Sequence, residues 1–339
     1  MMKYQEMNTF EKFNYCIETV KRSNLNLNKV SYSWNSDTDI KFNRILKMLS
    51  KYDDNESALE KFFDGDSKYI SYFIDIVKLY TAAIVPSEKE IESFEFKFKN
   101  KFNNIQNHQY NTIYEICLPE LYGIVLIKPN LVSYEDYPET TDIELLHVIL
   151  EKIKDYDINK LIVADGPSIF HEQNKPFMRL KNLQKNYKFE LVNANLEPTI
   201  RIKYDNMYKD IPIFIKNVDF LLNVAQFKEH NSAIYTGAIK NIFGLLPDYE
   251  KLKIHKKGVE DFYKEIASVY TILEPSLTIL DGRKIMKKAQ QKEHGGYIID
   301  DGFGILVGDG IIVDKEAIKI LNEKKLIDFY PEETYLKYL

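Results

Sequence analysis

The alternation of short apolar runs with amphipathic segments between residues 122 and 290 constrains the fold more than any other feature of the sequence. Each run is continuous in apolar residues and ends in polar residues or glycine, which is typical of buried strands. Strands that alternate with helices form a mostly parallel sheet with helices on both faces. We therefore expect an α/β fold. The predicted strands are 123–130, 161–164, 189–192, 213–215, 220–224 and 277–280.

A helix is expected between the first two strands, from about Asp142 to Lys154, with Thr140, Thr141 or Asp142 as its N-cap. Strand 220–224 leads into the stretch 223–255, in which we expect a loop and then a helix that starts near residues 232–236. We assign the α/β core that carries the site to residues 116–290.

Residues 1–115 have a different texture, with apolar residues at helical spacing and one glycine, Gly65. This pattern predicts an α-helical N-terminal region. Within it, Ser87 and Glu90 have the spacing of a capping box, which predicts a helix to about Asn100. We expect this region to have a structural role or to contact a protein partner.

Residues 291–339 begin with a glycine-rich run and predict a small C-terminal β/α segment packed on the core. The motifs 300–302 (Asp-Asp-Gly) and 309–310 (Asp-Gly) predict hairpin turns with positive φ. A helix is expected from Asp314 to about Lys325.

The charge balance argues against several classes of partner. Lys plus Arg is 46 and Asp plus Glu is 51, a net charge of −5, so we expect no nucleic-acid partner. The basic group at 251–257 is interpreted as a solvated face. No segment is apolar and long enough to predict a membrane span, and we expect a cytoplasmic protein. Cys16 and Cys117 have no ligand spacing, which excludes an iron–sulfur cluster bound in cis.

Polar residues gather where the predicted strands end. Lys128 and Asn130 follow the first strand, and Asp165 and Ser168 follow the second. Asp281 follows the last strand. Because ligands of open α/β sheets bind outside the carboxyl ends of the strands, these residues predict a site for a small molecule. Asp165 and Asp281 each precede glycine, so they are either turn residues or part of a cation site.

The stretch 223–255 holds the densest set of chemically capable side chains. His230 titrates near neutral pH and suits acid–base catalysis, unless it is an ordinary loop histidine. Lys240 is an anion clamp, a nucleophilic amine or an ordinary surface lysine. We predict catalytic roles for His230 and Lys240. The predicted substrate-binding residues are Lys128, Asn130, Ser168, Lys228, Thr236 and Asn241. The candidate ligands of a divalent metal ion are His255, Asp165 and Asp281.

Several motifs resemble those of the domain of unknown function (DUF) 362 family over about residues 120–320. They are Lys-Pro-Asn at 128–130, Ala-Asp-Gly-Pro at 164–167, and Thr-Gly-Ala-Ile-Lys-Asn-Ile-Phe-Gly at 236–244. Some family members are attached to iron–sulfur modules, but this chain lacks ferredoxin-type cysteines.

A more distant resemblance is to the N-terminal domain of nickel-pincer lactate racemase. The order His230, Lys240, His255 is similar to that family's pattern. The resemblance implies that Lys240 carries a tethered pincer cofactor, that His255 ligates nickel and that His230 is an acid–base residue. Ser168 stands where the racemases have a second acid–base histidine, and Ala238-Ile239 replaces their double glycine. We take this resemblance to indicate shared architecture more than shared chemistry.

These observations favour an enzyme that acts on a small anionic metabolite of the carboxylate or acyl type. We expect His/Lys acid–base chemistry, metal-assisted if a divalent ion binds, and proton transfer next to a carbonyl rather than redox chemistry. One alternative is a non-catalytic ligand-binding or accessory protein of a redox or biosynthetic pathway, docked through residues 1–115. A second alternative is a nickel-pincer-like racemase or epimerase.

Overall fold

The computed structural model describes residues 91–92, 108–168, 175–197, 199–204, 207–255 and 257–339. All of them belong to one compact unit, Lys89–Leu339. Among the described helices, none is both long and apolar enough to cross a bilayer. The expected helices and protein-partner surface of residues 1–90 and 93–107 lie outside the described residues.

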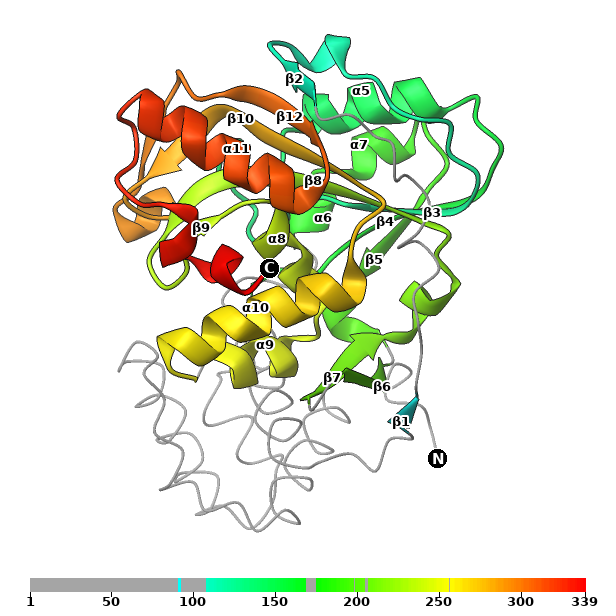
Figure 1. The fold of residues 1–339 in the computed structure, drawn as a ribbon. Coiled ribbons are helices and arrows are strands. Elements are labelled where there is room, and N and C mark those ends of the chain that lie inside the picture. The colour runs from blue at the N-terminus through cyan, green and yellow to red at the C-terminus, as the bar shows by residue number, and fades with distance from the viewer. Residues whose placement is uncertain (1–90, 93–107, 169–174, 198, 205–206, 256) are drawn as a thin grey trace, which may run out of the picture. The chain divides into compact units, whose positions relative to one another are not determined.

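A nine-stranded, mostly parallel sheet forms the centre of this unit (Figure 1). Its strands are β2 (His108–Tyr110), β3 (Gly123–Lys128), β4 (Ile158–Asp165), β5 (Glu190–Asn193), β8 (Phe220–His230), β9 (Ile234–Thr236), β10 (Leu277–Lys287), β11 (Tyr297–Ile299) and β12 (Gly304–Gly308). The strand order is β2-β12-β10-β8-β3-β4-β5, with β11 beside β10 and β9 beside β8. Neighbours from β10 to β5 run parallel, whereas β2, β9, β11 and β12 add antiparallel pairs.

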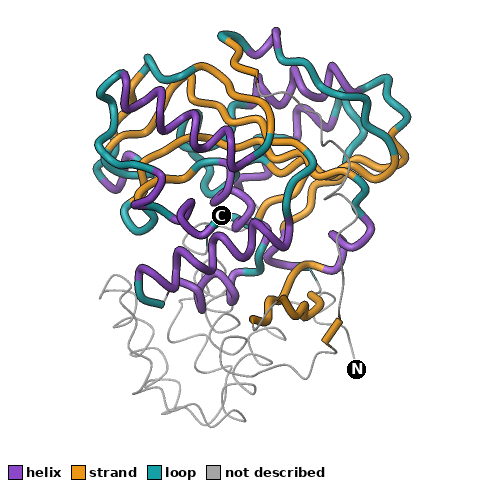
Figure 2. The backbone as a smooth tube through the Cα atoms, in the orientation of Figure 1, coloured by secondary structure: helices purple, strands orange, loops and turns teal. Residues whose placement is uncertain are grey.

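Helices cover both faces of the sheet, which confirms the predicted α/β class (Figures 1 and 2). The helices are α5 (Ile143–Ile153), α6 (Lys175–Met178), α7 (Lys181–Gln184), α8 (Ala238–Ile242), α9 (Asp248–His255), α10 (Val259–Leu273) and α11 (Gly310–Glu323). Val125 and Ile127 of β3 pack with α5, α6 and α7, whereas Leu126 packs with α8, α10 and α11. Both sets of alternating side chains are therefore apolar, which explains the continuous apolar runs in the sequence.

Two aspartates begin the helices that flank the sheet. The Asp142 side chain accepts a hydrogen bond from the N–H of Glu144 at 3.0 Å, which confirms one of the three predicted caps of α5. Asp309 accepts from the N–H groups of Ile311 and Ile312 at 2.9 and 3.0 Å. Such caps satisfy backbone donors that the helix leaves unpaired.

A second, three-stranded sheet lies beside α9 and α10 (Figure 1). It contains β1 (Ile91–Glu92), β6 (Thr199–Tyr204) and β7 (Met207–Pro212). No sequence pattern predicts these strands, and the helix expected over 87–100 is wrong at residues 91–92. The helical assignment of residues 1–115 also fails at β2, which pairs with β12 at the edge of the main sheet.

The central strand β8 extends past its neighbour β3. Lys128, the last residue of β3, pairs with Asn223, and β8 continues for seven residues to His230. The short strand β9 then folds back, so that Lys228 lies opposite Thr236. This extension carries Lys228 and His230 beyond the end of the parallel sheet, where a ligand site is expected.

Three other predictions are corrected. The predicted strand 213–215 is part of a 3₁₀ helix, η6 (Ile213–Asn217), because Pro212 has no N–H with which to continue a ladder. Strand 220–224 runs on to His230, and the helix expected near 232–236 begins only at Ala238, since β9 intervenes.

The C-terminal prediction is also revised. The helix expected from Asp314 begins at Gly310, with Asp309 as its cap, so 309–310 is not a hairpin turn. Positive φ occurs at Gly295, Gly304 and Gly308 instead of Gly302 and Gly310. Strands β11 and β12 both pair with β10, so the C-terminal segment completes the main sheet.

Candidate functional site

A buried ion pair joins the ends of β3 and β4. Lys128 Nζ lies 2.7 Å from Asp165 Oδ1, and the two side chains are 1% and 3% exposed. The other oxygen of Asp165 accepts the Leu131 N–H at 2.6 Å. Burial lowers the pKa of Lys128, and the Asp165 charge only partly opposes this effect. The predicted roles of Lys128 and Asp165 are in substrate binding and metal binding, respectively, but in the structure the two side chains pair with each other.

Three asparagine side chains connect β3, β8 and α8. Asn130 Nδ2 donates to Asn241 Oδ1 at 3.0 Å, and Asn241 Nδ2 donates to Asn223 Oδ1 at 2.8 Å. Asn223 Nδ2 donates to the carbonyl of Ala238 at 2.9 Å. All three asparagines are buried, so these bonds fix α8 against the strand ends. The predicted substrate-binding residues Asn130 and Asn241 therefore use much of their bonding capacity on each other.

Lys228 is a buried lysine with two neutral acceptors. Its Nζ donates to the carbonyl of Glu139 at 2.7 Å and to Asn130 Oδ1 at 3.3 Å. The residue is 2% exposed. Burial, followed by the charge of Lys240, lowers the pKa of Lys228 to about 7. An ammonium has three N–H groups, so one donor is left over.

Lys240 is the third residue of α8 and is partly buried. Its Nζ lies 5.5 Å from the centroid of the Phe243 ring. Within the part of the chain that the structure describes, this ammonium has no hydrogen-bond or ion-pair partner. Burial, followed by the charges of Lys251 and Lys128, lowers the pKa of Lys240 to about 8. Lys240 is therefore more available to a ligand than Lys128 or Lys228.

The backbone determines the tautomer of His230. Its Nδ1 accepts the N–H groups of Ser232 and Ala233 at 3.0 and 3.3 Å. An accepting nitrogen carries no proton, so the hydrogen of the neutral ring is on Nε2. Burial and then the charge of Lys240 hold the pKa of His230 well below its ordinary value. At neutral pH His230 is therefore an uncharged hydrogen-bond donor.

His255 has the opposite tautomer. Its Nδ1 lies 2.7 Å from the carbonyl of Lys251, which can only accept, so Nδ1 carries the proton and Nε2 has the lone pair. The ring packs against Phe243 and Phe262, with centroids 5.3 and 4.8 Å away. Burial, followed by the charge of Lys240, lowers the pKa of His255 to about 4. The imidazole is therefore neutral at pH 7, with Nε2 as its basic nitrogen.

The charge of Lys240 acts on three neighbouring titratable side chains. Its charge lowers the pKa of His230, Lys228 and His255. The charges of His255 and Lys228 also lower the pKa of His230. No hydrogen bond joins His230 to Lys240 among the described residues, so the link is through charge. We call Lys228, His230, Lys240 and His255 the lysine–histidine cluster.

Asp314 supports the helix that carries Lys240, a role that was not predicted from the sequence. Its two carboxylate oxygens accept the N–H groups of Ala238 and Ile239 at 2.7 and 3.1 Å, and the Tyr235 hydroxyl donates to one of them at 3.0 Å. Burial raises the pKa of Asp314 to about 7, although these bonds oppose the shift. The only sequence signal for this contact is that Asp314 is an acidic residue in α11. Its partner Ala238 lies 76 positions away, so the sequence does not identify it.

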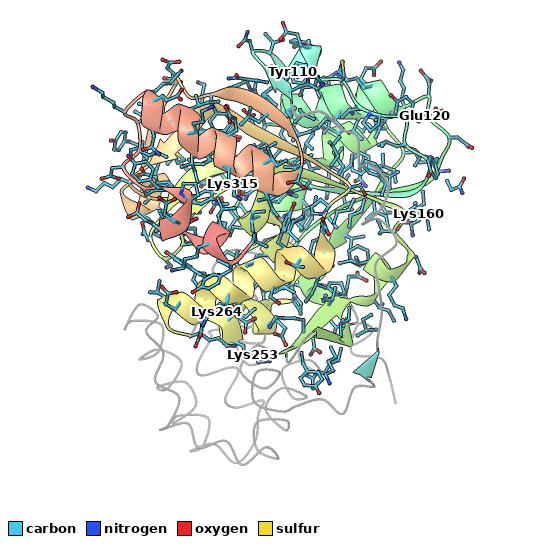
Figure 3. All side chains as sticks on the ribbon, in the orientation of Figure 1. Tyr110, Glu120, Lys160, Lys253, Lys264 and Lys315 are labelled. Atoms are coloured by element: carbon cyan, nitrogen blue, oxygen red, sulfur yellow. The ribbon has the colours of Figure 1, made fainter. Side chains whose placement is uncertain are left out.

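Lys251 corrects the interpretation of 251–257 as a solvated face. Its Nζ donates to the carbonyl of Gly166 and to Asn195 Oδ1, both at 2.8 Å, and lies 3.0 Å from Asp248 Oδ1. Lys251 therefore makes two hydrogen bonds and one ion pair, which hold it against the end of β4 and α9. Lys253 of the same segment is exposed on α9, as the side-chain view in Figure 3 shows.

The remaining predicted residues lie outside the lysine–histidine cluster or contact it only indirectly. Thr236 is buried opposite Lys228. The backbone N–H of Ser168 donates to the carbonyl of Val132 at 2.9 Å. Asp281 lies 2.7 Å from the Arg283 guanidinium, and Tyr137 donates to it at 3.3 Å. Among the described residues, no three His, Cys, Asp or Glu side chains form a group that could hold a metal ion. The structure thus does not bring the three candidate metal ligands together.

The fold and this cluster define the class of protein: an α/β protein with a lysine–histidine site at the carboxyl ends of its strands. The family described as Domain of unknown function (DUF362) matches residues 125–319, and the chain belongs to this family. The matched segment begins in β3, ends in α11 and contains every residue of the lysine–histidine cluster. No curated protein matches the chain.

Proposed function

We propose that the protein is an enzyme that binds a small anionic metabolite of the carboxylate or acyl type and transfers a proton next to its carbonyl group. The observation that carries this proposal is the combination of two neutral histidines of opposite tautomer with an ammonium, that of Lys240, that has no polar partner among the described residues. Lys240 supplies positive charge, His230 supplies an N–H donor, and His255 supplies a lone pair.

Each group has a role in the proposed reaction. Nε2 of His255 takes the proton from the carbon next to the carbonyl, and the electron pair of the C–H bond moves onto the carbonyl oxygen. The N–H of His230 and the ammonium of Lys240 stabilise that developing negative charge. Donors placed at an oxyanion typically contribute about 100- to 1,000-fold in rate each. Return of the proton to the carbon restores a neutral His255.

Electrostatics support this assignment. His255, with a pKa of about 4, is unprotonated at neutral pH and has a lone pair for a proton, but it is a weaker base than a histidine that titrates near pH 7. A neutral histidine that polarises a carbonyl must keep its N–H and carry no charge, which the lowered pKa of His230 favours. Both shifts arise first from burial and then from the charge of Lys240.

The experiment is exchange of solvent deuterium into a panel of carboxylates and acyl thioesters, followed by mass spectrometry. We expect exchange into at least one compound, and a loss of at least about 100-fold in His230→Ala, His255→Ala and Lys240→Met. Lys315→Met, an exposed lysine on α11 (Figure 3), is the matched control. Exchange that survives in Lys240→Met contradicts the proposal. Binding without exchange favours the non-catalytic accessory alternative.

A nickel-pincer enzyme is a second candidate, favoured by the Lys240 amine and by Nε2 of His255, for both of which the described part of the chain supplies no hydrogen-bond partner. In that case Lys240 would hold the cofactor and His255 would ligate the nickel ion, and their available nitrogens fit these tasks. The bound group would supply a metal centre beside the substrate. His230 would still donate or accept a proton through Nε2. Intact mass and nickel content of the native protein test this candidate, and an unmodified, nickel-free Lys240 contradicts it.

A further inference from the structure

One aromatic ring, that of Phe243, contacts both Lys240 and His255. Its centroid lies 5.5 Å from Lys240 Nζ and 5.3 Å from the centroid of the His255 imidazole. Phe243 follows the last residue of α8, and its N–H donates to the carbonyl of Lys240. Residues three apart in a helical turn are neighbours on its surface, which places the ammonium beside the ring. The ring is buried, so its position is set by the core.

A second phenyl ring, that of Phe262 in α10, also packs on His255. Its centroid lies 4.8 Å from the imidazole and 6.3 Å from the Phe243 ring. The plane of Phe243 makes angles of 69° with the imidazole and 89° with Phe262, the edge-to-face geometry that aromatic pairs favour. The hydrogen bond from Nδ1 to the Lys251 carbonyl adds a third contact. Two rings and one hydrogen bond therefore restrain the imidazole.

The contact between Phe243 and Lys240 differs from these because it depends on charge. An ammonium is attracted to the electron-rich face of an aromatic ring, and the attraction is stronger away from water. A neutral amine lacks this attraction, so the contact favours the charged form of Lys240. It acts against burial, which lowers the pKa of Lys240 to about 8. Phe243 therefore affects the charge of Lys240 as well as its position.

We propose that Phe243 is a positioning residue that holds the ammonium of Lys240 and the imidazole of His255 in a fixed relation to each other. In the proposed reaction, Lys240 faces the carbonyl oxygen while His255 faces the adjacent carbon. A misplacement of about 1 Å between such groups can cost about 100-fold in rate. The catalytic consequence of this role rests on the proposed function, whereas the two ring contacts do not.

The experiment measures the pKa of Lys240 in the full-length protein, from the pH dependence with which an acylating reagent labels its peptide. Phe243→Leu removes the aromatic face but keeps an apolar side chain. We expect the labelling midpoint to fall by about half a unit to one unit, the size expected for the loss of one cation–π contact. A residue that only packs against Lys240 predicts the opposite sign, because a loosened ammonium gains water and its pKa rises toward about 10.4.

Phe262→Leu is the matched control, because Phe262 packs on His255 and, within the described residues, makes no cation–π contact with Lys240. We expect it to leave the Lys240 midpoint unchanged. Both variants are expected to shift the NMR resonances of the His255 ring, since each removes an aromatic neighbour.

Fluorinated phenylalanine at position 243 keeps the test decisive if Phe243→Leu does not fold. Fluorine preserves the shape of the ring and withdraws electron density from its face, which weakens its attraction for a cation. We expect the Lys240 midpoint to fall with monofluorinated phenylalanine and to fall further with the trifluorinated residue.

Three results would overturn this inference: a Lys240 midpoint that stays or rises when the face of the Phe243 ring is removed or weakened, an equal fall in Phe262→Leu, or unshifted His255 resonances in Phe243→Leu. The outcome is separable from the test of the proposed function, because labelling and NMR need no substrate. The expected shifts in a protein that exchanges no deuterium sink only the enzymatic proposal. Exchange that is as fast in Phe243→Leu as in the wild-type protein sinks only the positioning role.

Discussion

Lys128 and Asp165 form a buried ion pair, with 2.7 Å between Nζ and Oδ1, across the ends of two adjacent parallel strands. Because both side chains are nearly inaccessible to water, loss of one partner leaves the other as an uncompensated buried charge. We expect Lys128→Met to lower the free energy of unfolding by about 3 kcal/mol. Urea denaturation of Lys128→Met, Asp165→Asn and the double variant forms a double-mutant cycle. Additive effects would show that the pair does not couple.

Gly244 lies against the same ion pair, so a methyl group there is expected to disturb it. A Cβ at Gly244 would lie 2.5 Å from Asp165 Oδ1 and 2.9 Å from Lys128 Nζ. We expect Gly244→Ala to cost about 2 kcal/mol, as other overpacked sites do. Gly258→Ala is the control, because a Cβ at Gly258 meets nothing within 4 Å. Equal destabilisation of the two variants would contradict the close approach at Gly244.

Lys240 is expected to react with acylating reagents at lower pH than ordinary lysines do. With a pKa of about 8, half of its amine is neutral at pH 8, whereas an ordinary lysine with a pKa near 10.4 is almost fully protonated there. Peptide mapping by mass spectrometry as a function of pH measures this reactivity. We expect the labelling rate of the Lys240 peptide to rise with a midpoint near pH 8. A midpoint above pH 10 would contradict the assigned environment.

Asp314 makes stability depend on pH in a defined direction. Its pKa is about 7 in the folded protein and about 4 in the unfolded chain, so the folded state binds more protons between these values. The contribution of Asp314 to stability is therefore fully present below pH 4 and falls as pH rises to 7, by about 4 kcal/mol in total.

Asp314→Asn tests this dependence because the amide does not titrate. We expect the wild-type protein to lose stability relative to Asp314→Asn from pH 4 to 7, with a constant difference above pH 8. Asp301→Asn, at a side chain that is 92% exposed, is the control. A difference between wild type and Asp314→Asn that does not vary with pH would refute the raised pKa.

The elements with local signals were predicted from sequence. The continuous apolar runs predicted β3, β4 and β5, and Asp142 was among the predicted caps of α5. The rule that parallel strands present polar residues at their carboxyl ends correctly placed Lys128 close to Asp165.

The errors arose where distant residues decide the structure. No local pattern predicts that β9 lies between β8 and α8. Strand β9 pairs with the part of β8 that extends beyond the apolar run 220–224, and the sequence does not reveal that extension. Asp314 is a helix residue in sequence and a cap of another helix in space. Tautomers of His230 and His255 depend on which backbone groups face each ring, and no sequence pattern contains that information.

A crystal structure of the protein with malonate tests directly whether Lys240 and His230 contact the same ligand. We predict a carboxylate oxygen within about 3.2 Å of Lys240 Nζ and a hydrogen bond from His230 Nε2 to the same molecule. Malonate bound elsewhere, or side chains of Lys240 and His230 directed to opposite sides with no shared ligand, would contradict the proposed ligand site.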